Sequence, residues 1–122
     1  MANIRLGSIA LDCADPAPLA SFWADLLDGE VAFTSDDFVA VKTDRMWLAA
    51  TRVADYAPPT WPGAEAPKQI HLDLAVDDLM EAERRATGLG AVRAASQPAP
   101  ERYIVLFDPA GHPFCLTTQI PE

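Results

Sequence analysis

Two polar side chains, His71 and Asp73, stand two residues apart in the segment HLDLAVDD (residues 71–78). The alternation of apolar residues in this segment predicts a β-strand, and the spacing places both polar side chains on one face of it. A neutral imidazole can accept and return a proton near neutral pH. A carboxylate on the same face either faces water or binds a cationic or hydroxylated group. The pair therefore indicates ligand binding or acid–base catalysis, and the alternative is a structural histidine that hydrogen-bonds a strand neighbour.

The strand that carries His71 has a counterpart earlier in the chain. The segment SIALDCAD (residues 8–15) begins 63 residues before His71 (71 − 8 = 63), shows the same alternation and also ends at an aspartate. Its Ser8 and Asp12 fall on the face opposite to Cys13, which is expected in the core. A pattern that recurs at such an interval indicates a duplicated structural unit.

A helix is predicted after each of these strands. Asp15 and Pro16 supply an N-cap and a first-turn proline for the first helix, and an aspartate at 77–78 caps the second. The helices are predicted to end at 28–29 and 88–90, where glycine can adopt the left-handed cap conformation. Each helix has an apolar stripe that is typical of a helix lying on a sheet. The stripes are Leu19, Phe22, Trp23, Leu26 and Leu27, then Leu79, Ala82, Ala86 and Leu89.

Three short apolar segments separated by turns follow each helix and predict strands. They are Glu30–Thr34, Phe38–Lys42 and Arg45–Val53, then Ala91–Ala95, Arg102–Asp108 and Pro113–Gln119. The sequence thus predicts a single α+β domain over residues 1–122 that contains two tandem βαβββ modules. The modules cover 1–54 and 70–122, and the connector 55–69, with four prolines, Tyr56 and Trp61, is expected to be ordered.

Length and composition limit the remaining possibilities. A chain of 122 residues, 50% of them hydrophobic, can form a core without a metal or a disulfide, so Cys13 and Cys115 are expected as reduced thiols of a cytoplasmic protein. The net charge is −9, from 9 basic and 18 acidic residues, and the basic residues are scattered, which argues against nucleic acid. No segment approaches the roughly 20 apolar residues of a membrane span, so no membrane partner is expected.

Several motifs, in their order along the chain, resemble those of the vicinal oxygen chelate superfamily. It includes glyoxalase I, extradiol dioxygenases, fosfomycin-resistance enzymes and bleomycin-binding proteins. The motifs are DCADP (12–16), FW (22–23), LLDG (26–29), HLDLAVDDL (71–79) and DPAGHPFCL (108–116). The chain is most similar to small glyoxalase-like domain proteins, whose middle segment resembles RVADYAPPTWP (52–62). The resemblance implies two modules whose sheets curl into a ligand cleft, with the helices outside.

The resemblance also implies where a metal would be held. In metal-using members the ligands come from the first and last strands of each module, and the matching positions here are Ser8, Thr51 (or Ala49), His71 and Cys115. Only His71 and Cys115 are good ligands for a divalent ion, because Ser8 and Thr51 are weak neutral donors. The sequence therefore predicts no catalytic metal and no cofactor, with a divalent metal as the alternative.

Aromatic residues complete the predicted ligand-binding set. Trp47 shares strand parity with Thr51 and is expected to face the cleft, whereas Trp23 lies on the helix stripe and is expected in the core. Trp61 and Tyr103 can pack against a flat organic ligand. The predicted ligand-binding residues are Ser8, Asp12, Trp47, Thr51, Trp61, His71, Asp73, Tyr103 and Cys115. Among them, His71 is the candidate catalytic residue.

Cys115 has two interpretations. Beside His71 it could form a thiolate nucleophile, but cysteine is a common filler of buried strands and no third, orienting group is evident. His112 lies in a predicted turn and is expected to fix a hairpin rather than contact a ligand.

Two functions remain in competition. The favoured one is a metal-independent protein that binds a small organic ligand, in the manner of the bleomycin-binding members, and the acidic balance favours a cationic ligand. The alternative is a lyase, isomerase, epimerase or dioxygenase-like enzyme of the same superfamily, with His71 as base or metal ligand. The resemblance further implies a homodimer.

Overall fold

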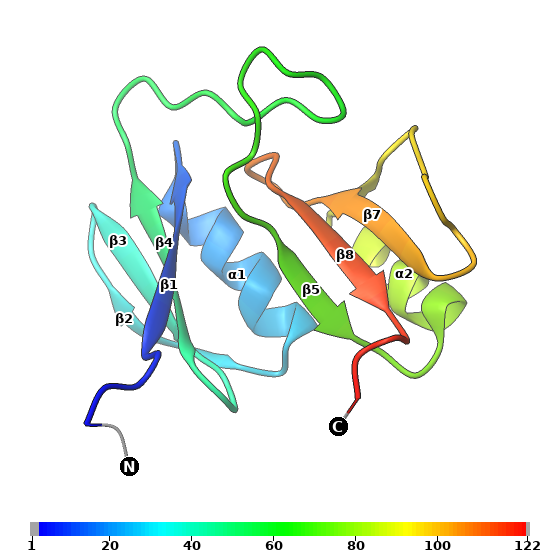
Figure 1. Ribbon diagram of the computed structural model, residues 1–122. Helices are drawn as coiled ribbons and strands as arrows, with labels where there is room; N and C mark the ends of the chain where they lie inside the picture. Colours follow the sequence, from blue (N-terminus) through cyan, green and yellow to red (C-terminus); the bar gives the residue numbers. More distant parts are fainter. Residues whose placement is uncertain (1–2, 122) are drawn as a thin grey trace. The chain divides into compact units, whose positions relative to one another are not determined.

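The computed structural model describes residues 3–121, and two compact units divide the chain between Ala57 and Pro58. Each unit holds one helix and one four-stranded mixed sheet (Figure 1). The predicted α+β class with two tandem βαβββ modules is confirmed. Neither helix of the described chain has the length and apolar character that crossing a bilayer requires.

In the first unit, the first and last strands lie side by side in the sheet. Its elements are β1 (Ser8–Cys13), α1 (Pro16–Leu26), β2 (Glu30–Thr34), β3 (Phe38–Lys42) and β4 (Trp47–Arg52). The strand order is β1-β4-β3-β2, with β1 parallel to β4 and the other neighbours antiparallel. A parallel pair needs a long crossover, and here it contains α1, β2 and β3.

The second unit repeats this topology. Its elements are β5 (Leu72–Ala75), α2 (Leu79–Gly88), β6 (Val92–Arg93), β7 (Tyr103–Phe107) and β8 (Pro113–Thr117). The strand order is β5-β8-β7-β6, again with a parallel first pair. The strand predicted within residues 71–78 is shorter than that segment, since β5 begins at Leu72 and ends at Ala75, and His71 directly precedes it.

The cores follow the predicted alternation. Leu11 and Cys13 are buried on β1, and Leu19, Phe22 and Trp23 of α1 are at most 3% exposed. Because α1 packs on β3 and β4, these side chains are removed from solvent. Burial of each large apolar side chain stabilises the fold by about 1.5–3 kcal/mol. In α2 only Ala86 is fully buried, and Leu79 and Leu89 of the predicted stripe are half-buried.

The helix ends match the predicted positions with two differences. Asp15 occupies the N-cap of α1 in an extended conformation, but its side chain makes no cap hydrogen bond, whereas Asp78 accepts one from the Glu81 amide at 3.1 Å. After α1 the left-handed residue is Asp28 (φ 53°) rather than Gly29. Gly29 is required for another reason, since a Cβ there would lie 2.5 Å from the Lys42 carbonyl oxygen.

β6 ends earlier than predicted, and the side chain of Gln97 takes the place of its backbone as a hydrogen-bonding partner of β7. After Arg93, the Gln97 amide nitrogen donates to the carbonyls of Ala94 (2.9 Å) and Val105 (2.8 Å), and its oxygen accepts from the Val105 amide (3.0 Å). Gln97 therefore satisfies the edge of β7 that a longer β6 would have paired with.

Internal hydrogen bonds join the two ends of part of the connector. The Thr60 amide donates to the Ala66 carbonyl at 2.7 Å, and the Ala66 amide donates to the Thr60 hydroxyl at 2.9 Å. Thr60 also bridges Pro67. These contacts close residues 60–67 into a clasp that carries Trp61.

The β7–β8 turn is built on a buried carboxylate. Asp108 is 3% exposed, and its Oδ1 accepts from the amides of Ala110 and His112, both at 2.9 Å. The Asp108 amide in turn donates to the His112 carbonyl at 3.0 Å. The backbone of His112 thus takes part in this hairpin turn, and a role for its imidazole there stays a prediction.

Candidate functional site

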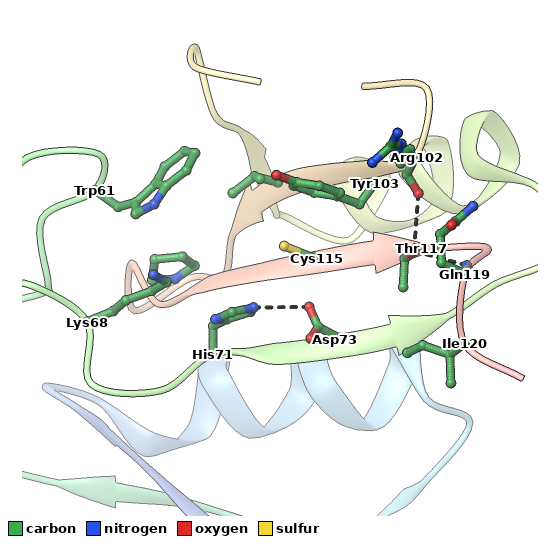
Figure 2. Close-up of a pocket in the computed structure, with 12 residues that line it drawn as sticks. Trp61, Lys68, His71, Asp73, Arg102, Tyr103, Cys115, Thr117, Gln119 and Ile120 are labelled. Carbon is green, nitrogen blue, oxygen red and sulfur yellow. Dashed lines mark hydrogen bonds and ion pairs between the residues drawn. The ribbon is translucent and has the colours of Figure 1, made fainter. Parts of the chain in front are cut away.

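A cavity of about 440 Å³ lies in the second unit, on the face of its sheet opposite to the buried Ile104, Leu106, Phe114 and Leu116. Figure 2 shows the residues around it, drawn from β5, β7, β8, the connector and the segment after β8. The alternation of strand side chains determines which residues reach the cavity. Tyr103 and Val105 of β7 lie on this face, and so do Pro113, Cys115 and Thr117 of β8.

Strand register brings polar groups into one row. Asp73 of β5 pairs with Cys115 of β8, and Cys115 pairs with Val105 of β7. His71 lies just before β5 on the side of Asp73. Backbone pairing thereby holds Cys115 beside Asp73, although the two residues are remote in sequence.

His71 and Asp73 form an ion-pair contact within the cavity. His71 Nε2 lies 3.1 Å from Asp73 Oδ1, and the two side chains are 36% and 49% exposed. At this distance the Nε2 proton can be donated to the carboxylate, which fixes the orientation of the ring. His71 Nδ1 is then the nitrogen that can exchange a proton with a ligand.

Cys115 is 9% exposed, and its surroundings raise the pKa of its thiol from 9.0 to about 11. Burial is the main cause, followed by the negative charge of Asp73 and a hydrogen bond to Asp73, while Lys68 acts in the opposite direction. The thiol therefore keeps its proton at neutral pH and donates a hydrogen bond to Asp73. In the absence of a metal, these surroundings favour the packing interpretation of Cys115 over the nucleophile interpretation, because the thiolate is the reactive form.

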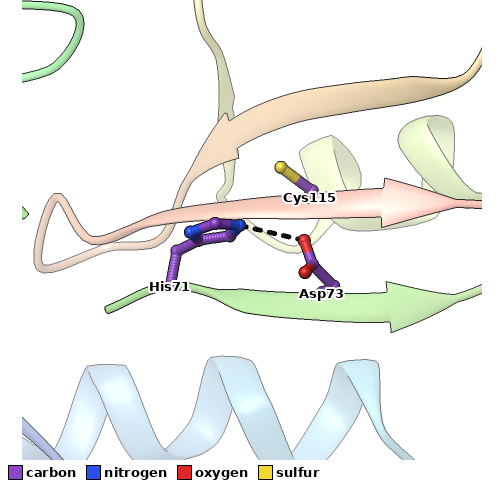
Figure 3. A group of neighbouring side chains, drawn as sticks. All are labelled: His71, Asp73 and Cys115. Carbon is purple, nitrogen blue, oxygen red and sulfur yellow. Dashed lines mark ion pairs between the residues drawn. The ribbon is translucent and has the colours of Figure 1, made fainter. Parts of the chain in front are cut away.

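The same three side chains could hold a metal ion. One ligand atom each of His71, Asp73 and Cys115 lies within 4.8 Å of the others (Figure 3). Imidazole, carboxylate and thiolate together form a donor set that suits Zn²⁺. The residues present therefore fit a divalent ion better than the sequence predicted, because Asp73 adds a third donor to His71 and Cys115.

Aromatic side chains and cations surround the polar row. Trp61 and Tyr103 are half-buried and pack beside Cys115, and the Trp61 ring lies 6.4 Å from that of Phe107 in an edge arrangement. Lys68 and Arg102 also line the cavity. The lining contains these two basic side chains and one carboxylate, that of Asp73, so it does not share the acidic balance of the whole chain. The expectation that this balance favours a cationic ligand is therefore not supported by the lining.

The predicted site residues separate into two groups. Trp61, His71, Asp73, Tyr103 and Cys115 line the cavity. The other four lie on β1 and β4 of the first unit, where Ser8 pairs with Trp47 and Asp12 pairs with Thr51 on the less buried face of the sheet. Ligand binding by these four residues stays a prediction.

Sequence reasoning missed several lining residues. Strand parity with Tyr103 and Cys115 could have identified Val105, Pro113 and Thr117. No pattern marked the remaining lining residues, which come from loops or strand ends; these are Lys68, Arg102, Gln119 and Ile120.

Comparison with known proteins places the chain in a family. The profile of the glyoxalase-like domain matches residues 8–117, so the chain belongs to this family. The predicted membership of the vicinal oxygen chelate superfamily is thereby confirmed. No curated protein sequence matches the chain.

Solved structures support the same fold. The fosfomycin resistance protein FosX from Mesorhizobium loti is 18% identical, with a TM-score of 0.73 over 98% of this chain and 94% of that chain. An E126Q mutant of FosX from Listeria monocytogenes, in complex with Mn(II) and 1S,2S-dihydroxypropylphosphonic acid, is 18% identical, with a TM-score of 0.72 over 98% and 95%. A glyoxalase/bleomycin resistance protein/dioxygenase family enzyme from Burkholderia phytofirmans PsJN is 14% identical, with a TM-score of 0.69 over 93% and 97%.

Proposed function

We propose that this protein binds a small organic molecule in the cavity of its second unit. The observation that carries the proposal is the convergence of an aromatic wall and a polar row on one cavity of about 440 Å³. Small-molecule sites have volumes of roughly 300–1,000 Å³ and combine apolar walls with a few placed polar groups. Trp61 and Tyr103 supply the wall, and His71 and Asp73 supply the polar groups.

The charges of the lining favour a ligand that carries an anionic or strongly polar group. Lys68 and Arg102 can bind such a group, while the aromatic rings cover its carbon skeleton. The FosX structure with a dihydroxypropylphosphonic acid supports this direction, since that ligand is small, anionic and hydroxylated. Hydroxyl groups are suitable partners for His71 and Asp73.

The test is a ligand titration followed by amide NMR and thermal unfolding. The probes are small aromatic carboxylates and phosphonates, with aromatic amines as the opposite charge. We expect an acidic probe to shift the amide signals of β7 and β8 and to raise Tm, because binding to the native state stabilises it.

Two matched variants locate the site. Trp61→Ala should weaken binding by at least about tenfold, since an aromatic wall contributes more than 1 kcal/mol. Met80→Ala, at a residue that is 75% exposed on α2, should leave it unchanged. Equal effects of the two variants, or shifts confined to the first unit, would place the ligand elsewhere.

A second candidate function is acid–base catalysis, and the His71–Asp73 contact is the observation that favours it. Asp73 orients the imidazole, so that Nδ1 can remove a proton from a carbon next to an oxygenated group of the ligand. This is the proton transfer of a lyase, isomerase or epimerase. His71→Gln should then abolish turnover with ligand binding kept within about threefold, whereas loss of both together would leave only the binding role.

A homodimer remains part of the proposal. Light scattering coupled to size exclusion should give twice the mass of one chain. A single-chain mass over the working concentration range would rule it out.

A further inference from the structure

We propose that the acidic group of the ligand binds at one end of the cavity, beside Arg102 and Gln119, and that Thr117 is the positioning residue that holds this end together. The inference rests on the proposed ligand binding and adds where the charge of the ligand lies. Figure 2 shows these three residues at one end of the cavity, and Lys68 and His71 lie at the other. The group of Arg102, Thr117 and Gln119 is called the arginine end below.

Strand register separates the two ends of the cavity. Tyr103 pairs with Thr117 at the arginine end, and Phe107 pairs with Pro113 at the other. Four steps along β7, at about 3.3 Å each, place these two pairs roughly 13 Å apart. Asp73 of β5 lies level with the middle of this interval, because its partner is the central residue of β8. A small ligand that spans the cavity therefore meets different groups at its two ends.

The distribution of charge favours the arginine end for an anion. Lys68 shares its end of the cavity with His71, which contacts the carboxylate of Asp73 at 3.1 Å. A negative charge is thus already present on that side. At the arginine end, none of the lining residues in the described part of the chain is acidic. A guanidinium can bind a carboxylate or phosphonate through two parallel hydrogen bonds, and the side-chain amide of Gln119 can add a third.

The hydroxyl of Thr117 joins two segments of the chain. Thr117 is 8% exposed, and its Oγ1 donates to the Arg102 carbonyl and accepts from the backbone amide of Gln119, both at 3.1 Å. A hydroxyl has one proton, and here the Arg102 carbonyl receives it, so a ligand cannot. Thr117 therefore acts through its neighbours. It links the start of β7 to the segment that follows β8.

The backbone of Arg102 is held on both sides. Its amide donates to the Ala99 carbonyl at 2.9 Å, and its carbonyl accepts from Thr117. The side chain of Arg102 is exposed, so the guanidinium extends from a fixed backbone into a region that a ligand can reach. A group whose backbone is already ordered loses less conformational entropy when it binds.

The test compares two probes of the same shape, 3-phenylpropionate and its uncharged amide, 3-phenylpropanamide. Their dissociation constants are measured by amide NMR titration of the full chain at low salt, which limits screening. The wild type should bind the acid at least about fivefold more tightly, because hydrogen bonds to charged partners are stronger than neutral ones. Arg102→Gln should abolish this preference, whereas Lys68→Gln should reduce it by about twofold at most. Equal affinity for the two probes, binding of neither, or equal losses from the two variants would overturn the arginine end.

Three further variants test the role of Thr117. Thr117→Val keeps the shape of the side chain and removes both hydrogen bonds, so it should lower the preference for the acid by at least about threefold. Thr117→Ser keeps the hydroxyl and should retain the wild-type preference. Thr87→Val is the matched control, because the Thr87 hydroxyl donates to backbone carbonyls of α2, outside the cavity, and its loss should change neither affinity.

A purely structural role of Thr117 gives a different result. An equal loss of affinity for both probes in Thr117→Val, or the same behaviour of Thr117→Ser and Thr117→Val, would refute the positioning role. Should Thr117→Val not fold, the wild type supplies a second measurement. The acid should shift the backbone amide signals of Arg102 and Gln119 more than 3-phenylpropanamide does, and equal shifts would contradict the proposal.

The same titrations separate this inference from the proposed function. If both probes bind equally tightly and shift the amide signals of β7 and β8, the proposed ligand binding stands and the arginine end is wrong. If no organic probe shifts these signals, the proposed function fails, and this inference fails with it.

Discussion

Asp73 and Cys115 face each other across the parallel β5–β8 pair, so that one carboxylate accepts a hydrogen bond from the Cys115 thiol while it contacts the imidazole of His71 at 3.1 Å. Asp73 is therefore the residue that links the other two. Removing its charge changes both neighbours without altering the sheet.

Substitution of Asp73 by Asn should make Cys115 more reactive. With a pKa of about 11 instead of 9.0, the thiolate population near neutral pH is lower by about a hundredfold. Asn removes the charge and the strong acceptor, which lowers the pKa toward 9.0, although burial still keeps it above that value. We expect several-fold faster alkylation of Cys115 by iodoacetamide in chelator-treated protein, measured by peptide mass spectrometry. Cys13, which is 1% exposed, is the internal control, and equal rates in both proteins would contradict the role of Asp73.

The raised pKa of Cys115 also predicts a loss of stability at alkaline pH. Between 9.0 and about 11 the folded protein keeps a proton that the unfolded chain has released, so stability falls as pH rises through this range. The contribution is fully present below pH 9 and amounts to about 3 kcal/mol. Urea unfolding at about pH 8 and about pH 10 should show a larger loss for wild type than for Cys115→Ala. Parallel losses would mean that the thiol does not take part.

Gln97→Ala should destabilise the second unit by about 1–3 kcal/mol, because the buried Val105 amide loses its acceptor. Urea unfolding measures the loss, and faster hydrogen exchange at the Val105 amide locates it. Gln69→Ala, at an exposed residue of the connector, is the matched control and should change stability by less than about 0.5 kcal/mol. Unchanged exchange at Val105 would show that the side-chain pairing is not formed in solution.

A pair of glycines separates backbone strain from helix propensity. Gly111 has φ +86°, and a Cβ there would lie 2.7 Å from Pro58 Cβ, so Gly111→Ala should cost about 1–3 kcal/mol. Gly88 closes α2 with no atom within 4 Å of its added Cβ, so Gly88→Ala should be neutral or stabilise by up to about 1 kcal/mol. Thermal unfolding of the two variants under one buffer gives the comparison, and a stable Gly111→Ala protein would refute the close contact with Pro58.

Strand alternation predicted much of the site, because a period of two determines which side chains share a face. It placed His71 with Asp73, and the order of motifs placed Cys115 on the last strand. Asp73 is not among the metal positions that the superfamily resemblance implies, because those positions assign one ligand to each strand. The proximity of Asp73 to Cys115 depends on the register of the β5–β8 pair, which the sequence does not specify.

Loop residues could not be predicted in this way. Lys68 and Ile120 reach the cavity from segments without a periodic pattern, and the position of such side chains depends on tertiary packing. The early end of β6 has a similar origin, since a side-chain amide replaces the backbone partner of β7. The strand propensity of a residue describes its backbone preference, and it does not indicate that a side chain will take the place of a neighbouring strand.

The clasp at residues 60–67 closes on itself through Thr60 and Ala66, yet it presents Trp61 to the cavity. A wall that is anchored outside the sheet can be redesigned without rebuilding the core. Libraries that vary residues 61–65 between the fixed anchors would alter the shape of the cavity while leaving the row of His71, Asp73 and Cys115 intact. The clasp thus makes this small scaffold a starting point for engineered binders with new ligand preferences.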